Sequence, residues 1–340
     1  MSLTTPQGLA ARSQTIRACE VHQQAAALDA LDQDYEQLSR GSFSGLVAST
    51  TVAGVTLFVE ELGAAVFQAG ASCPGVLTIA AACDLSGEAY WNGRYIDGRA
   101  VIGFAAHRPF ALRTPLASRC VGLSVPISKL DNLLPGVSSE GWNRLLESKD
   151  CWTDGRDAGR RLADRMVMLH RLAGDPALAD DGSFDQLLDD VLEEVWQGFS
   201  AQVFSGKKLR EQSYPRIAMR ARDAMLGRLC DPTDVEALAR DLGCSRRALQ
   251  YAFQSVFGMR PVEYLRTLRL SAVRQLLLHP TVSTTVGDAA AQYGLTHLPR
   301  FARDYSRMFS ELPSQTLSRA RRVCETPSGQ YASLQGPSAA

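Results

Sequence analysis

The sequence predicts an α+β protein, in which a β-rich N-terminal barrel or sandwich with helices precedes an all-α C-terminal domain with two helix-turn-helix motifs. Three observations predict this division. Short apolar stretches separated by turn residues dominate residues 44–126, and helical periodicity dominates the chain beyond them. After residue 216, a pair of helices joined at a glycine occurs twice. A chain of 340 residues is long enough for two domains.

Residues 44–126 predict the sheet structure. The segment 44–62 is rich in Val, Thr and Phe, and four more strand candidates follow, separated by turns that contain Gly, Pro or Asp. These candidates lie at 76–83, 89–95, 100–104 and 121–127. Five or six short strands at this spacing are typical of a small barrel or sandwich.

Helices are expected from about residue 129. Leu162, Met166 and Leu169 form one apolar stripe at helical spacing, and a longer stripe follows. A helix with the longer stripe can pack onto its own domain or onto a second subunit, and the sequence leaves both possibilities open. The longer stripe consists of Phe184, Leu188, Val191, Leu192, Val195 and Phe199.

The repeated helix pair occupies residues 235–257 and 286–309, about 51 residues apart. In each copy a glycine, Gly243 or Gly294, ends a short first helix, as a left-handed turn position prefers. The second helix carries apolar residues at i, i+4 and i+8 on one face and basic or polar residues on the other, which is typical of a helix-turn-helix motif. The inward residues are Leu249, Phe253 and Phe257 in the first copy and Phe301, Tyr305 and Phe309 in the second.

Charge is divided unevenly, although the net charge of the whole chain is zero. Residues 205–322 hold 20 Lys+Arg and 10 Asp+Glu, a net charge of +10, so the remainder has a net charge of −10. This asymmetry indicates a polyanionic partner for the C-terminal part. The alternative is that two solvated surfaces merely differ in sign.

Several classes of protein are not expected. The sequence contains no run of about 18 apolar residues, so we expect no membrane-spanning helix. The first 20 residues show no secretory signal. Eight scattered cysteines without a C-x-x-C pair favour reduced thiols and a cytoplasmic location. No H-x-H or H-E-x-x-H pair, nucleophile elbow or phosphate-binding glycine loop occurs, so we expect no metal, no cofactor and no enzymatic activity.

The C-terminal segment resembles the DNA-binding region of the AraC/XylS family of bacterial transcription regulators. Leu295 and Ser310 depart from the family, which usually has Phe and Gly there. The N-terminal region loosely resembles regulators of ethanolamine-utilisation operons through F-S-G-L-V-A-S-T-T at 43–51. The C-terminal matching stretches are V-E-A-L-A-R-D-L-G-C-S-R-R-A-L-Q-Y-A-F-Q-S-V-F-G at 235–258, P-V-E-Y-L-R-T-L-R-L-S-A-V-R-Q-L-L-L at 261–278, V-G-D-A-A-A-Q-Y-G-L at 286–295 and F-A-R-D-Y-S-R-M-F at 301–309.

The resemblance implies a transcription activator that binds double-stranded operator DNA and is controlled by a small-molecule effector. It also implies contact with RNA polymerase and a homodimer. An effector-independent, architectural DNA-binding protein is the alternative. Arg and Gln are suited to guanine and adenine edges, whereas Leu and Pro side chains can read only thymine methyls or shape. By the resemblance, the DNA-binding residues are Arg246 on phosphate, Arg247, Gln250 and Tyr251 on bases, and Leu298, Pro299, Arg300 and Arg303 in the second motif.

These observations predict four segments. Residues 1–204 form the effector-sensing and dimerisation domain, 205–215 a linker, 216–323 the DNA-binding domain, and 324–340 a disordered tail. A helix at 261–278 joins the two motifs; its 18 residues span about 27 Å. That length suits two recognition helices placed about one DNA turn, about 34 Å, apart.

Overall fold

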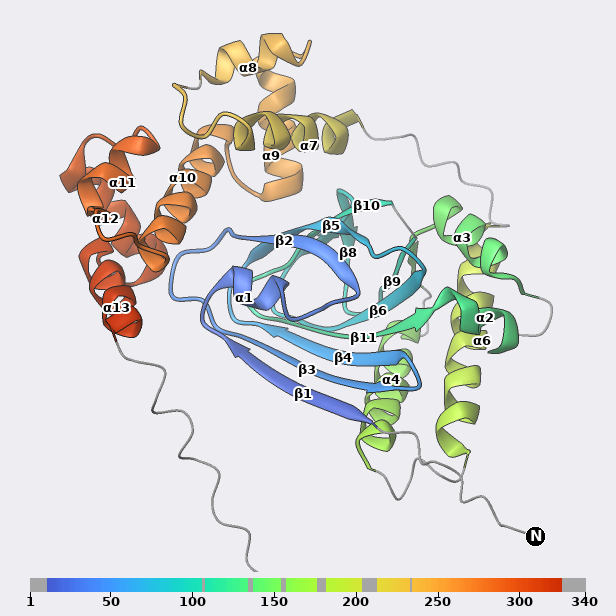
Figure 1. Ribbon diagram of the computed structural model, residues 1–340. Coiled ribbons are helices and arrows are strands. Elements are labelled where there is room, and N and C mark those ends of the chain that lie inside the picture. Colours follow the sequence, from blue (N-terminus) through green and yellow to red (C-terminus); the bar gives the residue numbers. More distant parts are fainter. Residues whose placement is uncertain are drawn as a thin grey trace, which may run out of the picture.

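The computed structural model describes residues 11–105, 108–133, 137–153, 157–175, 182–203, 213–232 and 234–325. Two stacked β-sheets with flanking helices form the N-terminal half of these residues, and a group of helices after residue 212 forms the C-terminal half (Figure 1). The predicted α+β class is therefore confirmed.

The larger sheet has seven strands, and every neighbouring pair in it is antiparallel. The predicted single stretch at 44–62 folds as a hairpin, because Ala53 and Gly54 both adopt positive φ and close a two-residue turn. In spatial order the strands are β1 (Arg12–Ala18), β3 (Gly45–Val52), β4 (Val55–Leu62), β11 (Ser118–Pro126), β6 (Val76–Leu85), β9 (Val101–Phe104) and β12 (Cys151–Trp152).

The smaller sheet has five strands. Nine described strands, β3 to β11, lie within residues 44–126, so the five or six expected there were too few. The strands that sequence analysis missed include β1 and β2, whose residues are mostly polar and do not show the apolar pattern that predicts a strand. In spatial order this sheet contains β2 (Leu31–Gln37), β5 (Val66–Ser72), β10 (Pro109–Arg113), β7 (Ala89–Trp91) and β8 (Arg94–Ile96).

Aromatic side chains fill the space between the two sheets. Phe104 of the larger sheet lies between Trp91 and Phe110 of the smaller one, with ring centroids 4.9 and 4.8 Å away. All three rings are buried, and edge-to-face contacts of this kind add to the hydrophobic gain of burial. The short helix α1 (Val21–Ala25) packs on the strands beside them.

Helices cover the outer face of the larger sheet: α4 (Ala158–Gly174) and α6 (Ser183–Val203), with α2 (Ile127–Leu133) and α3 (Ser139–Ser148) nearby (Figure 1). The whole predicted stripe of α6 is buried in this core, and Val191 is 0% exposed. The stripe therefore packs within its own subunit. Of the two possibilities that the sequence leaves open, the structure therefore shows packing within the subunit, because this face of the helix is already covered.

Every regular element that the structure describes after residue 212 is a helix. These helices lie beyond the smaller sheet, on the side of the sandwich away from α4 (Figure 1). None of the described helices is both long enough and apolar enough to span a membrane. The helices are α7 (Ser213–Leu226), α8 (Val235–Asp241), α9 (Arg246–Phe257), α10 (Pro261–Leu278), α11 (Val286–Gln292), α12 (Leu298–Phe309) and α13 (Pro313–Glu325).

The predicted linker and tail fall mostly on residues outside the described ranges. Residues 204–212 belong to that part, and α7 already begins at Ser213, inside the segment assigned to the linker. Helix α13 continues to Glu325, so it includes the first residues assigned to the tail, and 326–340 are not described.

The outer face of the smaller sheet carries the helical half. Phe67 on β5 meets Phe257 at the end of α9, with ring centroids 4.7 Å apart, and Ala69 and Ala111 are buried in the same core. The order of layers is therefore α4 and α6, the larger sheet, the smaller sheet and the C-terminal helices. The two halves share a hydrophobic interface.

Candidate nucleic-acid interface

The first helix-turn-helix motif is built by α8 and α9, as predicted. Asp234 caps α8 by accepting a hydrogen bond of 3.0 Å from the backbone N–H of Glu236, and the Ser245 hydroxyl caps α9 by accepting one of 3.1 Å from Ala248. Gly243 takes a positive φ of 65° in the turn between them, a conformation that favours glycine. The caps and the turn fix where α9 begins and in which direction it points.

Helix α9 buries its apolar face and exposes the predicted DNA-binding residues. Leu249, Phe253 and Phe257 are buried against α7 and α10. The exposed residues of the opposite face lie toward the N-terminal end of the helix. The free backbone N–H groups at that end favour anions. The exposed predicted residues are Arg246, Arg247, Gln250 and Tyr251.

The exposed arginines of α9 have partners that DNA could replace. The Arg247 guanidinium donates to the Tyr251 hydroxyl over 3.1 Å and lies 5.4 Å from the centre of its ring. Arg246 pairs with Glu236 over 2.6 Å, and both side chains are more than 60% exposed. Exposed pairs contribute little to stability, so either arginine can move onto DNA at small cost.

The second motif, α11 and α12, repeats this construction with different residues. The Thr285 hydroxyl caps α11 by accepting a 3.1 Å hydrogen bond from Asp288, and Gly294 has a φ of 69°. His297 caps α12 by accepting a hydrogen bond of 3.2 Å at Nδ1 from the backbone N–H of Arg300. The predicted residues Leu298, Pro299, Arg300 and Arg303 are all exposed on α12, together with Arg307.

Sequence reasoning missed two side chains at this surface. Tyr214, at the start of α7, places its ring 6.3 Å from that of Tyr251, and His297 caps the second recognition helix. The signal for His297 was its position directly before the first turn of α12, where a side-chain acceptor is expected. Tyr214 could not be found, because nothing in the local sequence relates α7 to the exposed face of α9.

Some of the basic residues that give the C-terminal half its positive charge do not face solvent. Arg222 and Arg274 are buried and pair with Glu36 and Glu20 of the N-terminal half. Burial by itself would lower the pKa of Arg274, but its hydrogen bonds to Glu20 raise it, so this guanidinium stays charged. The net charge of +10 therefore overstates the charge available at the surface.

The contacts that the N-terminal half makes with α9 and α12 lie at the C-terminal ends of these helices. Phe67 meets Phe257, and Arg113 lies against Gly258, the residue that ends α9. The backbone carbonyl of Met308, near the end of α12, accepts a 3.0 Å hydrogen bond from the N–H of Gly41. The N-terminal ends of both helices, with the eight predicted residues, remain exposed.

Comparison with known proteins supports the same assignment. A helix-turn-helix domain profile matches residues 238–319. The chain is 38% identical over 91 residues to XylDLEGF operon transcriptional activator 2 of Pseudomonas putida. The aligned residues cover 26% of this chain and 58% of that protein. It is 30% identical over 189 residues to a probable thc operon regulatory protein of Rhodococcus erythropolis, which covers 55% of this chain and 52% of that one.

Among solved structures, a probable AraC family transcriptional regulator from Rhodopseudomonas palustris is 34% identical to the aligned part, with a TM-score of 0.30. The match covers 31% of this chain and 97% of that one. The chain spans about half the length of the curated relatives with the strongest matches. The profile match and these relatives support an AraC/XylS-type regulator, with the DNA-binding likeness carried by the C-terminal helices that hold both capped motifs.

Proposed function

We propose that this chain is a sequence-specific, DNA-binding transcription regulator that reads two successive major-groove segments of one duplex. The observation that carries the proposal is that α9 and α12 both expose a basic N-terminal face, while the single helix α10 joins their motifs. An α-helix fits the major groove of B-DNA, and exposed cations beside it can neutralise phosphates. No enzymatic activity is assigned.

In this proposal the two motifs read DNA in different ways. Arg247 and Gln250 can form bidentate hydrogen bonds with guanine and adenine. At the start of α12, Leu298 and Pro299 have no side-chain donor, so this motif reads thymine methyls and groove shape, and Arg303 supplies its hydrogen bonds. The first motif therefore contributes more base discrimination than the second.

We also propose that a small-molecule effector binds in the N-terminal half. Between the sheets, Glu60 is buried and accepts hydrogen bonds from Tyr35 and Gln24. Gln24 Oε1 and Gln68 Nε2 are buried without a hydrogen-bond partner among the described residues. Unsatisfied buried polar atoms are costly, and a polar ligand would satisfy them. We propose further that the chain forms a homodimer in the cytoplasm and contacts RNA polymerase. It would then activate transcription of an operon under the control of this effector.

A salt titration of the full-length chain tests DNA binding. Its affinity for a random 40-base-pair duplex, about four turns of DNA, should fall linearly on a log–log plot, with a slope of about −0.9 for each phosphate neutralised. The same titration on a duplex selected by the chain from a random pool should show tighter binding with a similar slope. A folded chain with no salt-dependent binding would contradict the proposal. Equal affinity for both duplexes would support the architectural alternative.

A further inference from the structure

The two helix-turn-helix motifs have separate hydrophobic cores, and both cores are built on α10. This helix is the covalent connection between the motifs, and long helices curve gently instead of staying straight. The relative position of α9 and α12 therefore also depends on any other part of the molecule that touches both motifs. The first core uses Tyr264, Leu265 and Leu268 of α10, and the second uses Leu270, Val273 and Leu277.

The N-terminal half holds the first motif through Glu36. Its Oε1 atom accepts hydrogen bonds of 2.7 Å from Nε and Nη2 of Arg222 on α7, and its Oε2 atom accepts one from the hydroxyl of Tyr264 on α10. The side chains of Glu36 and Arg222 are only 10% and 8% exposed. Since charges so deeply buried need partners, this carboxylate ties α7 and α10 to strand β2.

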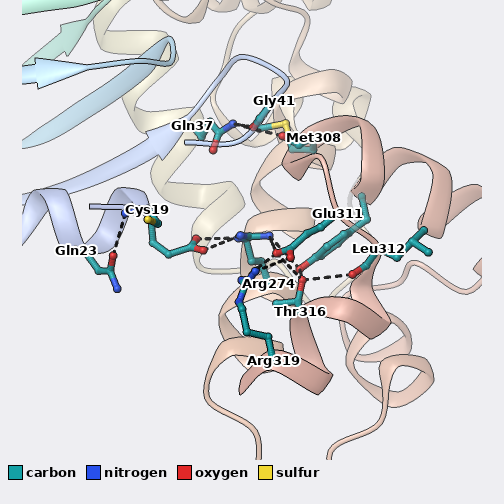
Figure 2. Close-up of polar contacts among 12 residues, drawn as sticks. Cys19, Gln23, Gln37, Gly41, Arg274, Met308, Glu311, Leu312, Thr316 and Arg319 are labelled. Carbon is teal, nitrogen blue, oxygen red and sulfur yellow. Dashed lines mark hydrogen bonds and ion pairs between the residues drawn. The ribbon is translucent and has the colours of Figure 1, made fainter. Parts of the chain in front are cut away.

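The N-terminal half holds the second motif through Glu20. The Arg274 guanidinium on α10 donates two hydrogen bonds to Glu20, of 2.6 and 2.8 Å, and its third nitrogen lies 2.8 Å from Glu311 (Figure 2). Glu311 also pairs with Arg319 of α13 over 2.7 Å. The bidentate contact fixes both the distance and the orientation of the guanidinium.

A third contact lies at the end of α12. The Met308 carbonyl accepts hydrogen bonds from Gly41 N–H, at 3.0 Å, and from Gln37 Nε2, at 3.4 Å (Figure 2). Gln37 follows Glu36 on the same strand, so one short segment of β2 reaches both motifs.

We propose that Glu20 and Glu36 are positioning residues, through which the N-terminal half sets the distance and angle between the two recognition helices on DNA. This inference rests on the proposed DNA recognition. With both carboxylates in place, the two motifs and the N-terminal half form one braced body, and the chain accepts one separation between its two DNA subsites. Without them, Arg222 and Arg274 lose their partners in the N-terminal half, which then holds the motifs less firmly, through contacts such as Phe67 with Phe257 and the hydrogen bonds to the Met308 carbonyl.

Both positioning residues lie close in sequence to residues that contact Glu60 between the sheets. Tyr35, next to Glu36 on β2, donates to Glu60 over 2.8 Å, and Gln24, four residues after Glu20, donates over 3.0 Å. Successive side chains of a strand point to opposite faces, so Tyr35 points into the sandwich and Glu36 toward the DNA-binding helices. A ligand that displaces these hydrogen bonds acts on both positioning residues together.

The spacing between subsites provides the test. The probe is a duplex that the wild-type chain selects from a random pool, with zero, one or two base pairs inserted between the two footprints. Each inserted pair rotates one subsite by about 34°. We expect two insertions to weaken wild-type binding by about tenfold or more. The same two insertions should weaken DNA binding by the full-length Glu20→Gln, Glu36→Gln variant clearly less. On a duplex that carries the first subsite alone, this variant and wild type should bind with equal affinity.

Controls separate the positioning role from general damage. The Glu61→Gln variant removes an exposed carboxylate of the same half and should keep the wild-type spacing profile. If the double variant does not fold, Glu20→Gln alone carries the test, because Arg274 keeps Glu311 as a partner. Identical spacing profiles for wild type and a folded variant would overturn the inference.

A measurement without DNA distinguishes failure of this inference from failure of the proposed function. Small-angle X-ray scattering should give a larger radius of gyration for the double variant than for wild type and Glu61→Gln. A variant as compact as wild type would overturn the brace even if DNA binding is sequence-specific. A wild-type chain that selects no sequence would instead refute the proposed function, whatever the scattering shows.

Discussion

The Tyr35 hydroxyl lies 2.8 Å from Glu60 Oε1, in the buried space between the two sheets. Gln24 donates to the same carboxylate oxygen over 3.0 Å, and no cation among the described residues forms an ion pair with Glu60. Burial raises the pKa of the Glu60 carboxyl, although the side chains that hydrogen-bond to it act in the opposite direction. An acidic group in such a site makes the stability of the N-terminal half depend on pH.

The Glu60→Gln substitution should remove this pH dependence. A carboxyl whose pKa is higher in the folded than in the unfolded chain stabilises the fold at low pH, and that contribution is lost as pH rises through the folded-state pKa. Relative to the variant, the wild-type free energy of unfolding should therefore fall above the unfolded-state pKa of 4.5, by at most about 1.4 kcal/mol per pH unit. Urea unfolding between about pH 5 and pH 8 measures the difference, with exposed Glu61→Gln as the control.

The Arg247→Ala substitution should weaken binding to the selected duplex by about 1–3 kcal/mol and binding to random DNA by much less. Its side chain contacts the exposed Tyr251, through a hydrogen bond and the face of the ring, so the fold should be unaffected. Arg246→Ala, predicted to contact phosphate, should weaken binding to both duplexes alike. Titrations at one fixed salt concentration measure both. Equal losses for Arg247→Ala on the two duplexes would mean that this arginine contacts phosphate instead of a base.

Sequence periodicity and the two turn glycines predicted the C-terminal half well. Gly243, Gly294 and the polar residues before each helix act locally, so their role can be read within a few positions. The polar strands β1 and β2 could not be found this way. They form because residues distant in sequence pair with them: β1 pairs with β3, and β2 pairs with β5. The contacts of β2 reach further still, since Glu36 meets Arg222, 186 residues along the chain. The whole contact surface between the halves depends on such pairs.

The Val191→Arg substitution should unfold the N-terminal half, whatever its effect on oligomeric state. Val191 is fully buried between α6 and the larger sheet, so an arginine there would be a buried charge without a partner. A loss of about 4 kcal/mol or more is expected. Asp190→Arg, on the exposed face of the same helix, should change the free energy of unfolding by less than about 0.5 kcal/mol. A folded, monomeric Val191→Arg protein in sedimentation would restore the interpretation of a subunit interface.

The residues that end the two recognition helices should respond to substitution in opposite ways. Gly258 and Ser310 both adopt the left-handed conformation, with φ of 72° and 58°, and both donate a backbone hydrogen bond to the preceding turn. A side chain in this conformation is strained, so Ser310→Gly should raise the free energy of unfolding by up to about 1 kcal/mol. Gly258→Ala should lower it by about 1–2 kcal/mol from backbone strain alone.

At Gly258 a Cβ atom would also collide with the Arg113 guanidinium of the N-terminal half, so this end of a long side chain must move, and a loss beyond the strain measures how firmly it is held. Ser310 has the same role at the end of α12, so it is the matched comparison. Urea unfolding of both variants at one pH measures the two effects. If Ser310→Gly were destabilising, the serine side chain would have to make a stabilising contact that outweighs the strain. If Gly258→Ala costs no more than the backbone strain, Arg113 moves aside freely, and the close contact between strand β10 and the end of α9 does not hold that end in place.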